Sequence, residues 1–200
     1  MKLKIGVMGT ATEKVRQAYQ RKAYDLGRHI AVQDCIIVTG ACPGLPYWAA
    51  RGCKEAGGFS LGISPGLSLD EHIHKYHAPA DQYDVLVFTG SGLMGRELTN
   101  IRTSDFVVVI GGRSGTLGEF AIAYDEGKLV GVLKGSGGIS GEIERIVRLC
   151  RKKTGAKILY DVDPNRLIDR LLRDYKTSHF KKPSVFSRRR SSLKEDTLGA

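Results

Sequence analysis

Residues 106–124 read FVVVIGGRSGTLGEFAIAY, and this stretch decides the fold. The apolar run at 106–110 is typical of a strand buried on both faces, and FAIAY at 120–124 indicates the buried face of a helix. A glycine-rich turn separates them. Glycines let a backbone approach a ligand closely, and the first amides of a helix have no partner within it. The stretch therefore predicts a site for a phosphorylated small molecule.

The same alternation of apolar runs and amphipathic stretches extends along the chain. Strands are predicted at residues 3–8, 35–38, 59–63, 85–88, 106–110, 129–133 and 157–160. Helices are predicted from a capping-box pair at Thr10 and Glu13, at 48–55, at 93–102, after Glu119, at 139–152 and from Pro164, with 67–82 irregular. Such alternation favours an α/β, doubly wound, Rossmann-like three-layer sandwich with a mostly parallel sheet. One domain is expected over residues 1–175.

Composition and charge narrow the class of protein. The apolar content of 42% suffices for a full core, and no apolar run approaches the roughly 18 residues of a membrane span. The four cysteines form no CxxC pair, which favours free thiols in a reducing cytoplasm. The net charge is +10, and residues 176–200 hold seven Lys or Arg against Glu195 and Asp196. This basic tail, expected to be flexible, either attracts nucleic acid or is a solvated end.

Several predicted strands end in a glycine beside a hydroxyl residue. In a doubly wound sheet the ligand lies at the carboxyl ends of the strands, so these loops are expected to converge on one crevice. The alternative for each is a plain tight turn. The candidate ligand-binding residues are Gly9, Thr10, Thr39, Gly40, Gly90, Ser91, Gly112, Arg113, Ser114, Gly115 and Thr116.

Five blocks of the sequence carry a family resemblance. They are TGACPGL at 39–45, AARGCKEAGG at 49–58, GISP at 62–65, RELTNIRTSD at 96–105 and the loop at 112–119. In this order and spacing they resemble the LOG-like (SLOG) superfamily over about residues 3–160. The chain looks most similar to the branch of molybdenum-cofactor carrier proteins and single-domain relatives. Many members were once labelled lysine decarboxylases, but the sequence offers no pyridoxal-phosphate lysine context.

The resemblance extends more distantly to the cytokinin riboside 5′-monophosphate phosphoribohydrolases. These enzymes cleave an N-glycosidic bond and share a PGGxGTxxE signature and an essential arginine. The resemblance places the glutamate of the signature at Glu119 and the arginine at Arg96. The signature proline is Gly111 here, its second glycine is Arg113, and the lysine after the arginine is Glu97. The resemblance therefore implies a retained phosphate loop with hydrolysis in question. It also implies a homodimer, with the helix at 93–102 near the subunit contact.

Three charged side chains have competing interpretations. Glu119 either faces the ligand, stabilising a ribosyl cation or orienting a water, or closes a capping box with Thr116. Arg96 either binds an anion or forms an ion pair with Glu97 or Asp105. Arg113 either donates to the phosphate or points to solvent or a neighbouring subunit.

The histidines at 72, 74 and 77 raise the question of a metal. Their spacing is compatible with metal ligands, but no clear strand or helix fixes them in the geometry that zinc requires. A mobile loop over the site mouth is favoured, with Ser68 and Glu71 as a further cap, and no metal is predicted.

The residues thus lead to three functions. The favoured one is a nucleotide- or phosphorylated-cofactor-binding protein that requires no cofactor of its own, with a nucleotide or a pterin-type phosphate as ligand. The alternative is a nucleoside 5′-monophosphate phosphoribohydrolase with Arg96 and Glu119 as catalytic residues. The second alternative is a nucleic-acid-associated protein that acts through its basic tail.

Overall fold

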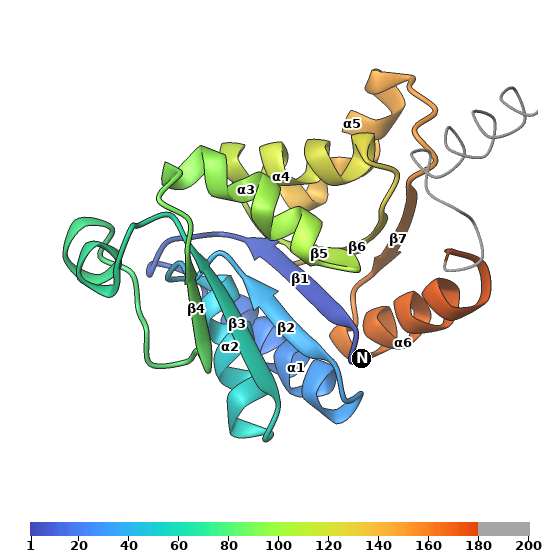
Figure 1. Ribbon diagram of the computed structural model, residues 1–200. Coiled ribbons are helices and arrows are strands. Elements are labelled where there is room, and N and C mark those ends of the chain that lie inside the picture. The colour runs from blue at the N-terminus through green and yellow to red at the C-terminus, as the bar shows by residue number, and fades with distance from the viewer. Residues whose placement is uncertain (180–200) are drawn as a thin grey trace, which may run out of the picture.

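A computed structural model describes residues 1–179 and shows a seven-stranded sheet in the order β4-β3-β2-β1-β5-β6-β7 (Figure 1). Every neighbouring pair of strands is parallel, which confirms the predicted α/β, Rossmann-like class. The predicted basic tail lies, from residue 180 on, outside the described residues. The strands are β1 (Lys4–Gly9), β2 (Ile36–Thr39), β3 (Phe59–Ser64), β4 (Val85–Phe88), β5 (Phe106–Ile110), β6 (Leu129–Leu133) and β7 (Lys157–Asp161).

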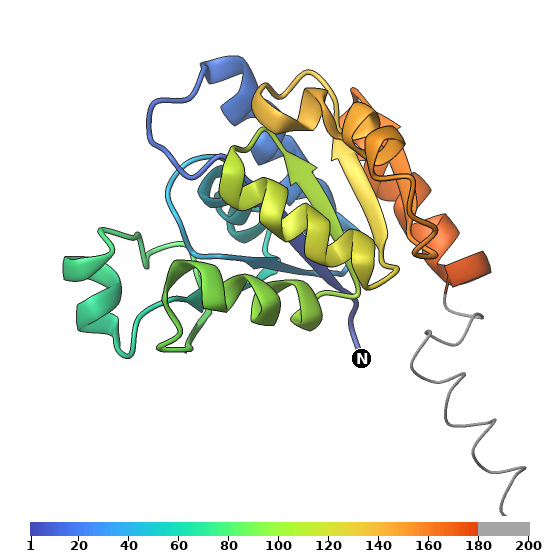
Figure 2. The ribbon, with the colours of Figure 1, turned by 90° about the horizontal axis from the view of Figure 1, so that it is seen from above.

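Helices cover both faces of the sheet, which gives the three layers. On one face lie α1 (Gln17–Val32), α2 (Leu45–Glu55) and α6 (Pro164–Asp174); on the other lie α3 (Gly92–Thr103), α4 (Ser114–Asp125) and α5 (Ile143–Cys150). Seen from above, α3 and α4 run side by side across the strands (Figure 2). No helix within residues 1–179 has the length and apolar character needed to cross a membrane.

The position of strand β5 between two layers of helices explains why its sequence is apolar throughout. Phe106, Val108 and Ile110 pack into the core beneath α1, α2 and α6, whereas Val107 and Val109 pack into the core beneath α3, α4 and α5. All five side chains are fully buried. A central strand covered on both faces needs apolar residues at every position, because successive side chains point to opposite faces.

The strand order places a topological switch point between β1 and β5. The chain winds outward from β1 through β2 and β3 to the edge strand β4, and then returns to the other side of β1. The loops that leave β1 and β5 therefore diverge, and a crevice forms between them at the carboxyl edge of the sheet. This geometry brings the glycine-rich loop at 111–116 beside the loop that follows Gly9.

One predicted helix start and one of the two interpretations of Glu119 are wrong. The Thr10–Glu13 pair opens no helix, because α1 begins only at Gln17. Its N-cap residue, Arg16, forms no side-chain capping bond, and the Thr10 hydroxyl accepts instead from the Gly112 amide. The Thr116–Glu119 pair also caps nothing, because α4 begins at Ser114.

Side-chain caps are present at two other helical segments, and the second, at Ser68, was predicted. Asp163 accepts a hydrogen bond from the Arg166 amide (2.8 Å) and begins α6 at Pro164. The Ser68 hydroxyl accepts from the Glu71 amide (3.2 Å), at the start of a short π-helix, η1 (Glu71–Lys75), within the segment predicted to be irregular. Two further short elements are η2 (Gly138–Gly141), before α5, and η3 (Tyr175–His179), after α6.

Candidate functional site

The loop between β5 and α4 depends on glycine for its path. Gly111 and Gly112 have φ angles of 62° and 96°, a region that side chains rarely adopt. A Cβ on Gly112 would lie 2.4 Å from the Cβ of Thr116, far closer than carbon atoms approach. The two glycines let the chain turn sharply out of the sheet and directly into α4.

Side chains from two other loops hold this turn in place. The Gly112 amide donates to the Thr10 hydroxyl (2.7 Å), and the Gly111 amide donates to the Ser136 hydroxyl (2.8 Å). The carbonyls of both glycines accept from the amides of Ile139 and Ser140, each at 3.0 Å. The polar groups of the turn are thus satisfied within the protein.

The start of α4 differs from the turn before it. The first amide bonded within the helix is that of Leu117, which donates to the Arg113 carbonyl (2.9 Å), so the amides of Ser114, Gly115 and Thr116 precede the hydrogen-bonded turns. The side chain of Arg113, the N-cap residue, forms no capping hydrogen bond. These donors, together with the positive end of the helix dipole, favour an anion.

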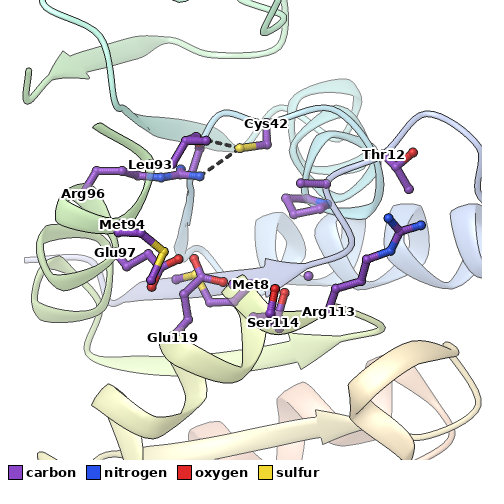
Figure 3. A pocket seen from close by; sticks show the side chains of 16 residues that line it. Met8, Thr12, Cys42, Leu93, Met94, Arg96, Glu97, Arg113, Ser114 and Glu119 are labelled. Carbon is purple, nitrogen blue, oxygen red and sulfur yellow. Dashed lines mark hydrogen bonds between the residues drawn. The ribbon is translucent and has the colours of Figure 1, made fainter. Parts of the chain in front are cut away.

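The amides lie beside a pocket of about 310 Å³ between α3, α4 and the ends of β1 and β2 (Figure 3). Many of the predicted site residues line it: Gly9, Gly40, Arg96, Arg113, Ser114, Gly115, Thr116 and Glu119. Sequence reasoning had not selected Met8, Cys42, Leu93, Met94 or Glu97, which line the pocket too. Most of these lie within a few positions of a selected residue, and that proximity was the one signal for them.

The other predicted ligand-binding residues do not line the pocket, and the hydroxyls of two of them form hydrogen bonds within the protein. The Thr39 hydroxyl pairs with the Tyr83 hydroxyl (3.0 Å) in the core, and the Ser91 hydroxyl donates to that of Thr89 (2.8 Å). The residues outside the pocket lining are Thr10, Thr39, Gly90, Ser91 and Gly112. Of these, Thr10 and Gly112 support the pocket through their mutual hydrogen bond.

Arg96 lies on the pocket wall with only 6% of its surface exposed. Its Nη1 donates to the Ile63 carbonyl (3.1 Å) and its Nη2 to the Cys42 Sγ (2.8 Å), whereas its Nε has no partner within residues 1–179. A Cβ on Gly40 would lie 1.6 Å from Nη1, so glycine is needed there to admit the guanidinium.

The ion-pair interpretation of Arg96 is wrong for the described part of the chain. Asp105 instead pairs with Lys4 (2.8 Å), and no carboxylate lies within salt-bridge distance of Arg96. The carboxyls of Glu97 and Glu119 are close enough to feel its charge but form no salt bridge with it, and a buried cation without a salt bridge is costly. Its position at the pocket favours an anionic ligand.

Glu119 lies within α4 and is 7% exposed, at the pocket. Burial raises the pKa of its carboxyl to about 7; the positive charge of Arg96 and a hydrogen bond with Asn100 oppose this shift, and Glu97 adds to it. The carboxyl therefore holds a proton for part of the time at neutral pH.

Glu97 is the second carboxyl of the pocket. Its Oε2 lies 3.0 Å from where a Cβ of Gly118 would be, and its Oε1 lies 3.4 Å from the corresponding position of Gly115. The two glycines thus leave room for this side chain between α3 and α4. Burial raises the pKa of its carboxyl, and the positive charge of Arg96 opposes this shift. Glu97 and Glu119 both reach into the space between the two helices (Figure 3).

Arg113 is exposed, whereas the three histidines differ: His74 and His77 are exposed and His72 is not. The Arg113 side chain is exposed at the pocket mouth and points away from Glu119, toward Thr12 (Figure 3). His72 is buried, with its ring nitrogens against the Ser64 hydroxyl (2.9 Å) and the Pro79 carbonyl (3.1 Å). Within residues 1–179, no three His, Cys, Asp or Glu side chains gather as metal ligands would.

The pocket therefore holds both hydrogen-bond donors and carboxyl groups. The amides of α4 and the nearby Arg113 suit the charge of a phosphate monoester, whereas Arg96 lies on the side of Glu97 and Glu119 (Figure 3). Glu97 and Glu119 suit hydroxyl or N–H groups of whatever the phosphate is attached to.

Comparison with known proteins agrees with this architecture. An uncharacterised protein of Archaeoglobus fulgidus is 34% identical over 132 residues, which cover 66% of this chain and 80% of that protein. The molybdenum cofactor binding protein from Rippkaea orientalis superposes with a TM-score of 0.69 at 26% identity, over 88% of this chain and 99% of that chain. The molybdenum cofactor carrier protein from Chlamydomonas reinhardtii gives 0.69 at 27% identity, over 86% and 99%.

A family model carries the assignment. The model of the SLOG cluster4 family matches residues 2–168, which span the sheet and the start of α6. The resemblance seen in the sequence is thereby confirmed, and the chain belongs to the SLOG cluster4 family.

Proposed function

We propose that this protein binds and carries a phosphorylated cofactor or nucleotide, with the phosphate on the amides of Ser114, Gly115 and Thr116. One observation carries the proposal: α4 begins without a side-chain cap and opens at a pocket beside the switch point of the sheet. Unpaired amides at a helix start attract anions through hydrogen bonding and the helix dipole together.

Arg96 and the size of the pocket support the same ligand class. The unpaired Nε belongs to a buried cation, whose charge a phosphate would balance. A volume of about 310 Å³ lies at the lower end of the range for small-molecule sites. The structural relatives named for the molybdenum cofactor favour a pterin-type phosphate. The free cysteines at positions 35, 42, 53 and 150 are consistent with a reducing cytoplasm as the place of action.

The test starts with native mass spectrometry of the full-length protein as purified, to weigh any retained ligand. Calorimetric titrations with GMP, AMP and guanosine then separate phosphate recognition from ring recognition. The proposal predicts binding of a monophosphate at least about tenfold tighter than that of the nucleoside, without release of free base. Equal affinity for guanosine and GMP would contradict it.

A hydrolase is the second candidate, and Glu119 is the observation in its favour. A carboxyl with a pKa of about 7 can donate a proton to a departing base at neutral pH. Arg96 would assist by holding the phosphate end of the nucleotide. Release of free base from AMP or GMP that disappears in Glu119→Gln would establish this activity, and binding without release would leave the carrier.

A homodimer is expected to form through exposed apolar side chains of α3, two of which also border the pocket. Leu93, Met94 and Leu98 are all exposed there, Met94 to 70%, and Phe88 at the sheet edge is exposed as well. Exposed apolar side chains gathered on one helix are typical of a subunit contact. Sedimentation should show a dimer that Met94→Lys with Leu98→Lys converts to a monomer, and a monomeric parent protein would contradict the expectation.

Binding of nucleic acid through the tail remains a prediction, since the tail from residue 180 on lies outside the described residues. Affinity for DNA that falls steeply with salt and depends on Arg188, Arg189 and Arg190 would support it.

A further inference from the structure

Cys42 is the thiol of the ligand pocket. It follows β2 in the chain, lines the pocket and lies beside Arg96 (Figure 3). The Arg96 Nη2 donates to its sulfur at 2.8 Å, and the thiol itself donates to the Gly40 carbonyl at 3.4 Å. Its sulfur therefore has a cationic donor on one side and the ligand space on the other.

The other three cysteines have different surroundings. Cys35 and Cys53 are buried, and burial raises the pKa of both thiols, that of Cys53 to about 12. Cys150 is exposed at the end of α5, and no hydrogen bond joins its sulfur to a residue of the described chain. The chain thus contains two buried thiols and one exposed thiol as internal references for Cys42.

Arg96 gives an independent indication that a ligand reaches Cys42. This side chain is more than nine-tenths buried, lines the same pocket, and its Nε has no partner within residues 1–179. A polar group left unpaired in this way is expected to meet a ligand or an ordered water. The group that meets Nε would also lie close to the sulfur bound by Nη2 of the same guanidinium.

The Cys42 sulfur thus borders the pocket and accepts a hydrogen bond from a guanidinium, a setting typical of reactive thiols. We propose that Cys42 is a modifiable thiol, and that its oxidation by a peroxide switches off ligand binding in this pocket. The inference rests on the proposed binding function. The thiolate sulfur attacks one oxygen of hydrogen peroxide, an S–O bond forms and the O–O bond breaks. The departing hydroxide takes a proton to become water, and the sulfur, oxidised by two electrons, becomes a sulfenic acid.

Oxidation would change the site in two ways. The added oxygen occupies pocket space next to Arg96, and the guanidinium loses the thiol partner that helps to hold it. Both changes act on the group that faces the ligand. A thiol that reduces the sulfenic acid would restore binding, so the modification is reversible.

The reactivity is tested on the full-length protein without ligand. N-ethylmaleimide is added at pH 7, and peptide mass spectrometry follows the labelling of each cysteine separately. Cys42 should react about tenfold faster than the more exposed Cys150, and Arg96→Met should remove that advantage while Cys150 keeps its rate. A Cys42 rate at or below that of Cys150 would overturn the proposal, whatever the pocket binds.

The switch is tested by the ratio of GMP binding after and before peroxide treatment, measured within each variant. Peroxide should lower binding at least about tenfold in the parent protein and in Cys150→Ser, with recovery after dithiothreitol. In Cys42→Ser the ratio should stay near one, whatever the starting affinity. Equal peroxide sensitivity of Cys42→Ser would overturn the switch. A parent protein that binds neither GMP nor AMP would refute the binding function instead.

Discussion

Two loops of this sheet have similar sequences and opposite properties. The loop at 111–116 and the loop at 89–91 each place glycine beside a hydroxyl residue after a parallel strand. In the first, the start of α4 leaves three amides ahead of its hydrogen-bonded turns, at a pocket. In the second, Thr89 donates to the Ser64 carbonyl, Ser91 donates to Thr89, and Gly90 donates to the Gly66 carbonyl.

The position of each loop in the strand order explains the difference. β5 lies beside β1 at the centre of the sheet. The loops that leave these two strands diverge, so space opens at the end of β5. β4 is the edge strand, and the segment after β3 lies against its end: Gly66 accepts from Gly90, and a Cβ on Gly90 would lie 2.3 Å from the Leu67 side chain. Of these two glycine-hydroxyl loops, only the one at the switch point borders the pocket and is proposed to bind the ligand.

The largest effect, on GMP affinity, is expected from a glycine-to-alanine substitution in the first loop, with the same substitution in the second loop for comparison. Gly112→Ala forces a side chain into Thr116 at a φ of 96°, which should cost about 1–3 kcal/mol of stability and lower GMP affinity by about a hundredfold or more. Gly90→Ala, at a φ of 63°, should cost similar stability. Thermal unfolding and calorimetry measure both quantities.

The control lies in the affinity of Gly90→Ala. In the structure this loop does not line the pocket, so the folded fraction of Gly90→Ala should bind GMP as the parent does. A similar loss of affinity in both variants would abolish the distinction between the two loops.

The fold and its central strand could be predicted from the sequence because their signals are local. Five consecutive apolar residues at 106–110 require a strand buried on both faces, and Gly112 marks the turn that follows. The start of α1 could not be predicted in this way. Thr10 and Glu13 have capping-box spacing, but Thr10 binds the Gly112 amide, 102 positions away, and that long-range bond takes precedence.

The next largest effect is expected on the pH dependence of stability. The pKa of Glu119 is about 7 in the folded protein and 4.5 ordinarily, so the folded state binds the extra proton between these values. Stability is therefore lost as pH rises from 4.5 to 7, by about 3 kcal/mol in total. Glu119→Gln, which carries no charge, should remove that component.

Urea unfolding of both proteins at pH 4.5, 6 and 8 measures this difference. The variant should gain stability relative to the parent with rising pH, most of all at pH 8. A difference that stays constant across the three pH values would show that Glu119 is not buried as described.

Arg96 is the next residue by size of effect. Arg96→Met keeps the length of the side chain but removes the cation from the pocket wall, which should weaken GMP binding about 30-fold. Arg102→Met is the matched control, since Arg102 lies on the same helix but pairs with Glu126 (2.7 Å) outside the pocket. The control should bind within about twofold of the parent. Equal losses in both variants would show a general charge effect.

The smallest effect is expected from loss of a side-chain hydrogen bond that holds the loop at 111–116 in place. Ser136→Ala removes the acceptor of the Gly111 amide and should cost about 1–2 kcal/mol of stability, with an affinity loss of about threefold. Ser91→Ala removes the corresponding hydroxyl of the other loop and should leave affinity unchanged. A larger loss of affinity in Ser91→Ala than in Ser136→Ala would reverse the comparison.

Only part of the site could be predicted from the sequence, and there is a physical reason why the rest could not. The motif from Gly112 to Glu119 marks one wall directly, and family resemblance adds Arg96 on the facing helix. Glu97 and Cys42 gained their roles only from packing: one fits over the glycines of α4, and the other contacts a guanidinium 54 positions away. Such contacts depend on how helices cross, which no local pattern records.

The central claim is that backbone amides at the start of α4 bind the phosphate. Amide NMR of the full-length protein tests it directly, as GMP and then guanosine are titrated. With GMP, the account predicts large shifts at Ser114, Gly115 and Thr116 and none at Gly90 and Ser91; guanosine should leave the α4 amides almost unchanged. Shifts at residues 90 and 91 with silent α4 amides would contradict the account.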